Sequence, residues 1–280
     1  RVVASTSAWG DLIASVAGGH AQVHSIIADP TQDPHSYQAD ARTQLRLSQA
    51  DLVVMNGGGY DDFVTTMLKA AAKSDSGAAG PGRTSASKPV VLDAVEISGY
   101  AASGGHSLNE HVWYDIPTAQ LVVAQIASSL SALDPAHAAD YAANAAGLRS
   151  SLDGLVARER SIAAAHAGAP VAVTEPVPLY LLDACGLVNK TPAGFAAAVE
   201  NETDASPRDM SAMLALFSTH SVRSLVYNAQ TAGPQTARAL GAAKSAGIPA
   251  IPVTETMPAG AHFVGWMNSA LDAIESSLSA

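Results

Sequence analysis

The chain has 280 residues, 48% of them hydrophobic, and its 15 Lys and Arg against 25 Asp and Glu give a formal net charge of −10 at pH 7. This length and apolar content indicate a globular protein with room for two domains, and they exclude an intrinsically disordered chain. The acidic balance, with no basic patch along the sequence, excludes nucleic acid as a partner, because phosphate binding requires clustered Lys and Arg.

In the first third of the chain, short apolar runs alternate with helical patterns. The runs predict strands at 2–4, 23–28, 52–55 and 90–92, and the patterns predict helices at 9–16, 41–50 and 61–72. Strands that alternate with helices of this length are typical of βαβ units and a parallel sheet. A stretch rich in Gly, Ser and Pro at 74–89 is expected to be a surface loop within this part.

The middle of the chain is helical for about fifty residues, with one interruption at Asp134-Pro135, where Pro135 suits the first turn of a new helix. A helix of about thirty residues spans about 45 Å, too long for the inside of one small domain and suited to joining two lobes. The sequence has no uninterrupted apolar run of about 18 residues, so we predict no membrane span.

The remaining sequence repeats the alternation of strands and helices. Strands are predicted at 171–173, 225–227 and 248–253, and helices at 179–184, 207–220, 232–246 and 261–279. The single cysteine, Cys185, has no disulfide partner and lies in an apolar run, so it is interpreted as a packed helix residue. We therefore expect three parts: an N-terminal α/β lobe over 1–133, a connecting helix over 134–168 and a C-terminal α/β lobe over 169–280.

Four short motifs carry the chemistry of this sequence. They are Asp-Pro-His-Ser-Tyr at His35, Asn-Glu-His-Val-Trp-Tyr-Asp at His111, Val-Thr-Glu-Pro at Glu175 and Val-Thr-Glu-Thr-Met-Pro at Glu255. Two imidazoles and two carboxylates from four loops form a plausible cage for a transition metal ion. Ligands of open α/β sheets bind beyond the carboxyl ends of the strands, where these motifs are predicted to lie. One such His or Glu alone is more often a solvated or capping residue, so the hypothesis depends on the four together.

Competing motifs are absent from the sequence. It contains neither HExxH, typical of metalloproteases, nor GxSxG, typical of α/β-hydrolases. The run Asn56-Gly57-Gly58-Gly59 follows a predicted strand but lacks both the GxGxxG spacing and the Gly-Lys-Ser/Thr of a phosphate-binding loop. A tight turn between strand and helix is the better interpretation of these glycines.

On these motifs, the chain resembles the zinc and manganese receptors (cluster A-I) among the solute-binding proteins of ABC transporters. The resemblance extends over nearly the whole chain and includes the starting Val-Val-Ala-Ser-Thr strand, the long helix and the Ala-Gly-Ile-Pro before the last strand. It implies an α/β fold of two lobes with mostly parallel sheets, joined by one long rigid helix, with the metal site in the interlobe cleft. It also implies that His35, His111, Glu175 and Glu255 are the metal ligands.

The resemblance further implies a function outside the cytoplasm. The protein would be a monomer in the periplasm or on the outer face of the cell membrane, a bacterial lipoprotein if a removed N-terminus carried the lipid. It would capture one Mn²⁺ or Zn²⁺ ion and deliver it to the membrane permease of an ABC transporter, with no catalytic activity. Two carboxylate ligands favour manganese or ferrous iron, whereas the Irving–Williams order favours zinc. We expect manganese to be the physiological ion, with zinc a close second.

Two departures from the family pattern concern the carboxylates. The third motif of the family usually reads Ser-Glu or Ser-His followed by a small residue and an aromatic one, but here Glu175 is followed by Pro176-Val177-Pro178. The fourth ligand is often Asp, and the longer Glu255 permits a different reach or bidentate binding. Asn228 and Tyr227, at the end of a predicted strand, are candidate partners of the ligands.

Two alternatives stay open from the sequence. The same four residues could serve a metal-dependent hydrolase with a bound water, for which Glu110, directly before His111, is the one spare acidic residue in the motifs. They could also hold a structural metal in a surface adhesin.

Overall fold

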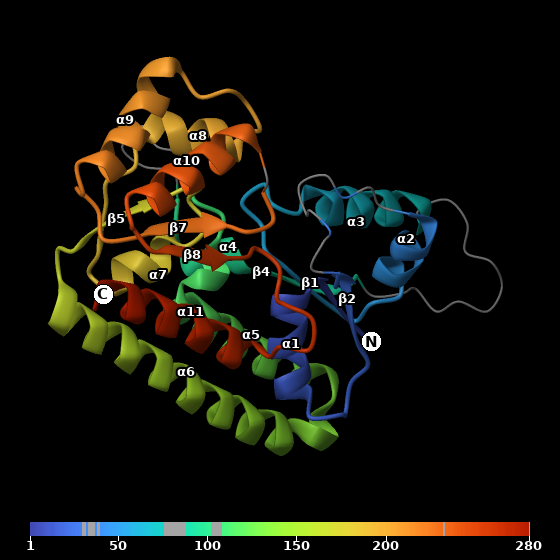
Figure 1. The fold of residues 1–280 in the computed structure, drawn as a ribbon. Coiled ribbons are helices and arrows are strands. Elements are labelled where there is room, and N and C mark those ends of the chain that lie inside the picture. Colours follow the sequence, from blue (N-terminus) through green and yellow to red (C-terminus); the bar gives the residue numbers. More distant parts are fainter. Residues whose placement is uncertain are drawn as a thin grey trace. The chain divides into compact units, whose positions relative to one another are not determined.

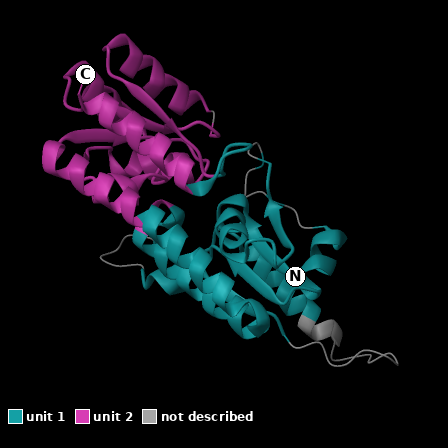
Figure 2. Ribbon diagram, turned by 90° about the horizontal axis from the view of Figure 1, so that it is seen from below, with its two compact units in different colours: residues 1–113, 117–152, 256–263 teal, residues 114–116, 153–255, 264–280 magenta. Residues whose placement is uncertain are grey.

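The computed structural model describes residues 1–29, 32, 37, 40–75, 88–101, 108–231 and 233–279. The chain forms two compact units (Figure 2). Unit 1 comprises 1–113, 117–152 and 256–263, and unit 2 comprises 114–116, 153–255 and 264–280. His35 and most of the loop predicted at 74–89 lie outside the described residues.

Unit 1 contains a four-stranded parallel sheet in the order β2-β1-β3-β4 (Figure 1). The strands are β1 (Val2–Thr6), β2 (Val23–Ile27), β3 (Leu52–Met55) and β4 (Val90–Asp93). The helices near it are α1 (Ser7–Ala17), α2 (Ala41–Ser48), α3 (Asp62–Asp75) and α4 (Ala94–Ser98). The predicted strands and helices are all present, and α4 is an addition that the sequence patterns did not reveal.

Both faces of this sheet are covered, which is why its central strands are apolar without alternation. On one face, Val3 and Val53 pack in a cluster with Leu47 of α2 and Val64 of α3. On the other face lies α1, where Gly10 approaches the sheet so closely that an added Cβ would overlap the hydroxyl of Ser25.

Unit 2 contains a second four-stranded parallel sheet in the order β6-β5-β7-β8. The strands are β5 (Pro170–Val173), β6 (Val188–Asn189), β7 (Leu225–Asn228) and β8 (Ala250–Val253). Its helices include α7 (Leu179–Ala184), α8 (Ala193–Glu200), α9 (Pro207–Ser218), α10 (Pro234–Ser245) and α11 (Phe263–Leu278). The sequence patterns missed β6 and α8; the other elements agree with the prediction within a few residues.

The core of unit 2 on one face of the sheet is built from α8, α9 and α10. Phe195, Met213 and Phe217 pack there with Ala172 of β5 and Leu225 of β7. Figure 1 shows α7 and α11 on the opposite side of the same sheet. Both units therefore have the expected α/β layering, with all strand pairs among the described residues parallel.

The helical middle of the chain consists of α5 (Ile116–Leu133), a 3-10 turn (Pro135–His137) and α6 (Ala138–His166). The predicted interruption at Asp134-Pro135 is present, and α6 continues unbroken for 29 residues. Among the described residues, α5 is the one helix whose length and composition would allow it to cross a membrane, and 44% of it is buried inside the protein. Residues 138–152 of α6 belong to unit 1 and its remaining residues to unit 2.

Candidate metal centre

His111 lies in unit 1 and is wholly buried, with 0% of its surface exposed. Asn109 fixes the ring, because its Oδ1 accepts both the backbone N–H of His111 at 3.2 Å and the Nδ1–H at 2.7 Å. An oxygen can only accept, so Nδ1 carries the proton and Nε2 carries the lone pair. This is the tautomer in which histidine binds a metal through Nε2 while its other nitrogen is held by an oxygen acceptor.

Aromatic side chains complete the surroundings of this ring within unit 1. The ring centroid of Trp113 lies 5.1 Å from that of His111 and the centroid of Tyr60 lies 6.1 Å away, both in edge-on arrangements. Trp113 and Tyr60 are themselves 4.7 Å apart and almost fully buried. These bulky neighbours leave the imidazole little freedom to rotate, which preorganises it as a ligand.

The glycine run after β3 supports the His111 motif. Asn56 is fully buried and donates from Nδ2 to the carbonyl oxygen of Glu110 at 2.8 Å. Gly57, Gly58 and Gly59 all have positive φ values of 79°, 68° and 98°, which only glycine adopts readily. The run is therefore a tight turn that anchors the segment before His111, as interpreted from the sequence.

The same turn has no room for a phosphate. Asp61 is fully buried and accepts the N–H of Asn56 at 2.6 Å and the N–H of Gly57 at 2.9 Å. Its carboxylate thus occupies the donors that an anion would need. Burial raises the pKa of Asp61, and the two backbone N–H groups act in the opposite direction.

Glu175 lies in unit 2, two residues beyond the end of β5, and is 3% exposed. The neighbouring Thr174 ties β5 to β7: its N–H donates to the carbonyl of Val226 at 3.1 Å, and its Oγ1 accepts the N–H of Asn228 at 3.1 Å. The following Pro176 and Pro178 form a short turn that leads directly into α7. The departure from the family motif thus leaves Glu175 at the strand end.

Glu255 also lies in unit 2, two residues beyond the end of β8, and is half-buried. Its Oε1 accepts Nδ2 of Asn228 at 2.7 Å, and its backbone N–H donates to Oε1 of Gln230 at 2.6 Å. Since β7 lies between β5 and β8 in the sheet, Asn228 at its end connects to Thr174 on one side and to Glu255 on the other.

Tyr114, which belongs to the second motif, supports the loop that carries Glu255. The hydroxyl of Tyr114 donates to the carbonyl oxygen of Thr254 at 2.8 Å, and its ring packs on Trp266. Burial, aided by the nearby Glu255, raises the pKa of Tyr114, so the phenol stays protonated and can only act as donor or neutral acceptor.

The structure thus places three of the four predicted ligands, and His35 lies outside the described residues. Unit 2 brings the ends of the Glu175 and Glu255 motifs to one edge of one sheet. Of the two candidate partners, Asn228 contacts Glu255, whereas Tyr227 packs into the core against α8–α10. The supporting residues Asn109, Asn56 and Gln230 were not identified from the sequence; only the position of Asn109 two residues before a histidine could have pointed to it.

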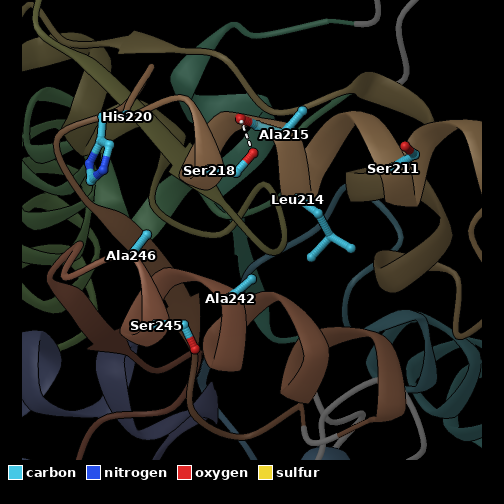
Figure 3. A pocket seen from close by; sticks show the side chains of 8 residues that line it. All are labelled: Ser211, Leu214, Ala215, Ser218, His220, Ala242, Ser245 and Ala246. Atoms are coloured by element: carbon cyan, nitrogen blue, oxygen red, sulfur yellow. Dashed lines mark hydrogen bonds between the residues drawn. The ribbon is translucent and has the colours of Figure 1, made fainter.

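A hollow on unit 2, away from these strand ends, does not fit a metal ion. It has a volume of about 610 Å³ and lies between α9 and α10 (Figure 3). The described residues that line it include the imidazole of His220 but no carboxylate. Its walls are otherwise small or apolar side chains such as Leu214, Ala215 and Ala242.

Comparison with known proteins decides the family. A family model described as ZnuA, zinc-uptake complex component A periplasmic, matches residues 2–277. The chain belongs to this family. The membership confirms the resemblance seen in the sequence, including the two-lobe α/β fold.

Curated proteins that are similar to this chain in sequence have names that refer to metal binding. A "putative metal-binding protein" of Treponema pallidum is 28% identical over 167 residues, covering 57% of this chain and 51% of the relative. The manganese-binding lipoprotein MntA of Bacillus subtilis is 27% identical over 146 residues, covering 52% of this chain and 44% of the relative. The chain spans about half the length of the curated relatives it matches.

Solved structures share the fold over nearly the whole chain. The periplasmic zinc-binding protein TroA of Treponema pallidum superposes with a TM-score of 0.76 at 21% identity, covering 99% of this chain and 98% of the other. The AdcAII protein of Streptococcus pneumoniae gives a TM-score of 0.78 at 18% identity, with the same coverage of 99% and 98%. At such identities the likeness concerns the fold.

Family and relatives agree with the predicted class of ligand. The names of the family and of these relatives refer to zinc uptake, manganese binding and metal ABC transporters, to periplasmic proteins and to lipoproteins.

Proposed function

We propose that this protein captures one divalent transition metal ion, Mn²⁺ or Zn²⁺, outside the cytoplasm and delivers it to the membrane permease of an ABC transporter. The ion is cargo, and the protein is a monomer without catalytic activity. The ligands assigned to the ion are His35, His111, Glu175 and Glu255.

One observation carries this proposal: the buried His111 has its Nδ1–H committed to Asn109, which leaves the metal-binding tautomer at Nε2. A histidine that served only to fill the core would gain nothing from this arrangement over an apolar ring of similar size. The strand-end positions of Glu175 and Glu255 supply the oxygen donors that complete a set suited to zinc or manganese.

The test is competitive titration of the metal-free protein with zinc and manganese, together with elemental analysis of the protein as purified. We expect one equivalent of metal, and we expect His111→Ala to weaken binding at least ~100-fold, because three remaining ligands leave the shell incomplete. His220→Ala is the matched control, since His220 lines the hollow between α9 and α10, and it should bind as the unmodified protein does. If no stoichiometric metal binds, or if both variants bind equally well, the proposal is wrong.

Transport and anchoring are separate parts of the proposal. The protein can be produced with a secretion signal or a lipid anchor, together with the matching permease, in cells that lack their own manganese and zinc receptors. We expect it to restore metal uptake in these cells. Uptake that is unchanged by His111→Ala would separate the protein from transport. A hydrolase would instead turn over an ester or peptide substrate in a manner that depends on bound metal, and the proposal predicts no such turnover.

A further inference from the structure

Asn228, the last residue of β7, orients the carboxylate of Glu255 by a hydrogen bond. It is 3% exposed and donates from Nδ2 to Glu255 Oε1 at 2.7 Å and to Thr231 Oγ1 at 2.9 Å. Its Oδ1 accepts the backbone N–H of Gln230 at 3.0 Å. Because that N–H requires an oxygen opposite it, the amide cannot be flipped, and the NH₂ group must face Glu255.

The backbone of Glu255 is held from the same segment. Its N–H donates to Gln230 Oε1 at 2.6 Å, while Asn228 is itself fixed to Thr174 through its backbone N–H. Both the main chain and the carboxylate of Glu255 are therefore positioned by residues at the end of β7 and just after it. Such a carboxylate has little freedom to turn about its final torsion.

The orientation has a consequence for the coordination of a metal ion. An oxygen that accepts a short hydrogen bond has one lone pair engaged and gives less electron density to a cation, so the second oxygen becomes the better ligand atom. Glu255 is then suited to binding through one oxygen. A Glu side chain is longer than Asp and could bind through both oxygens, but the hydrogen bond from Asn228 holds the carboxylate of Glu255 in one orientation.

One-oxygen binding favours one class of metal over another. Zinc sites in proteins are almost always four-coordinate with single-atom ligands, whereas harder cations accept more oxygen ligands, including bidentate carboxylates. Resting on the function proposed above, we propose that Asn228 is a specificity-determining residue, which holds Glu255 in one-oxygen coordination and thereby favours zinc over manganese at this site.

The experiment compares the unmodified protein with Asn228→Ala and Asn228→Asp in competitive titrations with zinc and with manganese. The aspartate keeps the size of the side chain and an acceptor for the N–H of Gln230, but it removes the donor to Glu255. Its added charge strengthens the binding of both metals, so the ratio of the two affinities is the quantity to read. Thr231→Val is the matched control: it removes the other acceptor of Nδ2 and leaves the hydrogen bond to Glu255 in place.

We expect Asn228→Ala to weaken zinc binding ~10- to 100-fold, as is usual for the loss of a partner of a metal ligand, and to change manganese binding by less than ~3-fold. Both Asn228 variants should lower the preference for zinc over manganese at least ~10-fold, and Thr231→Val should leave it within ~2-fold. X-ray absorption at the zinc edge should show more than four ligands in Asn228→Ala and about four in the unmodified protein.

Equal weakening of both metals, with no change in ratio or coordination number, would mean that Asn228 has a structural role alone and would overturn the inference. The function proposed above would survive that result, because it requires only that the unmodified protein bind one metal ion. Failure of the unmodified protein to bind either metal would overturn both. Thermal unfolding of each metal-free variant identifies any that fails to fold, in which case Asn228→Asp alone decides the question.

Discussion

The two sheets prepare their candidate ligands in different ways. In unit 1, His111 is oriented by Asn109, two residues earlier in the sequence, and its segment rests on a glycine turn. In unit 2, Glu255 is oriented by Asn228, 27 residues earlier and on another strand. The orientation of the His111 ring comes from its own motif, although the segment before it is also anchored by Asn56, 54 residues earlier. The orientation of Glu255 exists only once the parallel sheet has formed. Changes at Asn109 should therefore act on His111 alone, and changes in unit 2 should spread across several strand ends.

The largest effect is expected for the glycine turn of unit 1. Asp61→Ala removes the acceptor of two buried N–H groups, those of Asn56 and Gly57, and should lower the free energy of unfolding by about 4 kcal/mol. Asp61→Asn keeps one oxygen acceptor and should cost less than half as much. Urea denaturation measures both values; equal costs for the two variants would show that the turn does not depend on the paired acceptors.

Removing the local support of His111 should come next. Asn109→Ala releases the Nδ1–H, so the ring can turn or change tautomer, and metal affinity should fall ~10- to 100-fold. Asn109→Asp keeps an acceptor and should bind at least as well as the unmodified protein. Calorimetric titration with zinc distinguishes the two. A loss as large in the aspartate variant would contradict the assigned tautomer.

A buried carboxyl group in unit 2 contrasts with that of Asp61, which accepts two backbone N–H groups. Glu159 in α6 is 3% exposed, and burial, followed by the nearby carboxylate of Asp115, raises its pKa from 4.5 to about 7. The folded state therefore holds a proton that the unfolded chain releases above pH 4.5, so stability falls as the pH rises from about 4.5 to about 7 and is then level.

Glu159→Gln should remove this pH dependence. The variant should be about 2 kcal/mol more stable than the unmodified protein at pH 8 and nearly equal to it at pH 4.5. Thermal unfolding at the two pH values is the measurement. An equal difference at both would mean that packing, rather than the proton, accounts for the change.

A smaller effect is expected where β5 and β7 meet. Thr174→Val keeps the shape of a fully buried side chain but removes the Oγ1 that accepts the N–H of Asn228, so stability should fall by about 1–2 kcal/mol. Because the same contact aligns the two strand ends, metal affinity should fall with it. Thr219→Val, at the exposed end of α9, is the control and should change neither.

The smallest effect concerns His262, whose pKa is raised by its hydrogen bond to Asp11 and by the charge of that residue. The raised pKa contributes stability below about pH 6.5, and the contribution is lost as the pH rises through the pKa of the folded state. Asp11→Asn, which can still accept the N–H of Phe263, should flatten this slope. Stability measured between pH 6 and 8 should show a larger difference between the two proteins at pH 6 than at pH 8.

Much of the fold follows from periodicity in the sequence. The strand at Leu52–Met55 has the predicted bounds, because a short run of continuous apolar residues between turn signals is typical of a strand buried on both faces. The two-residue strand Val188–Asn189 is too short to carry a period, and the helix Ala193–Glu200 begins after Pro192 without a side-chain cap. Both were missed for these reasons.

The candidate site, like the fold, could be predicted from the sequence only in part. The ligands could be proposed from strand ends and motifs, and Asn228 from its place at the end of β7. The reach of Asn228 to Glu255 could not, because it depends on the order of the strands, which places β7 beside β8. Gln230, which fixes the backbone of Glu255, lies in a turn whose path the sequence does not specify.

The division of the chain into units also affects how the chain can fold while it is being synthesised. Unit 1 includes residues 256–263, where His262 and Phe263 bind Asp11 of the first helix. A growing chain that has emerged only through residue 152 therefore lacks part of its first unit, and the α1 segment waits for its partner until nearly the last helix is made. Unit 1 is therefore expected to complete its folding only at the end of synthesis, and chaperones have a long interval in which to bind the incomplete unit.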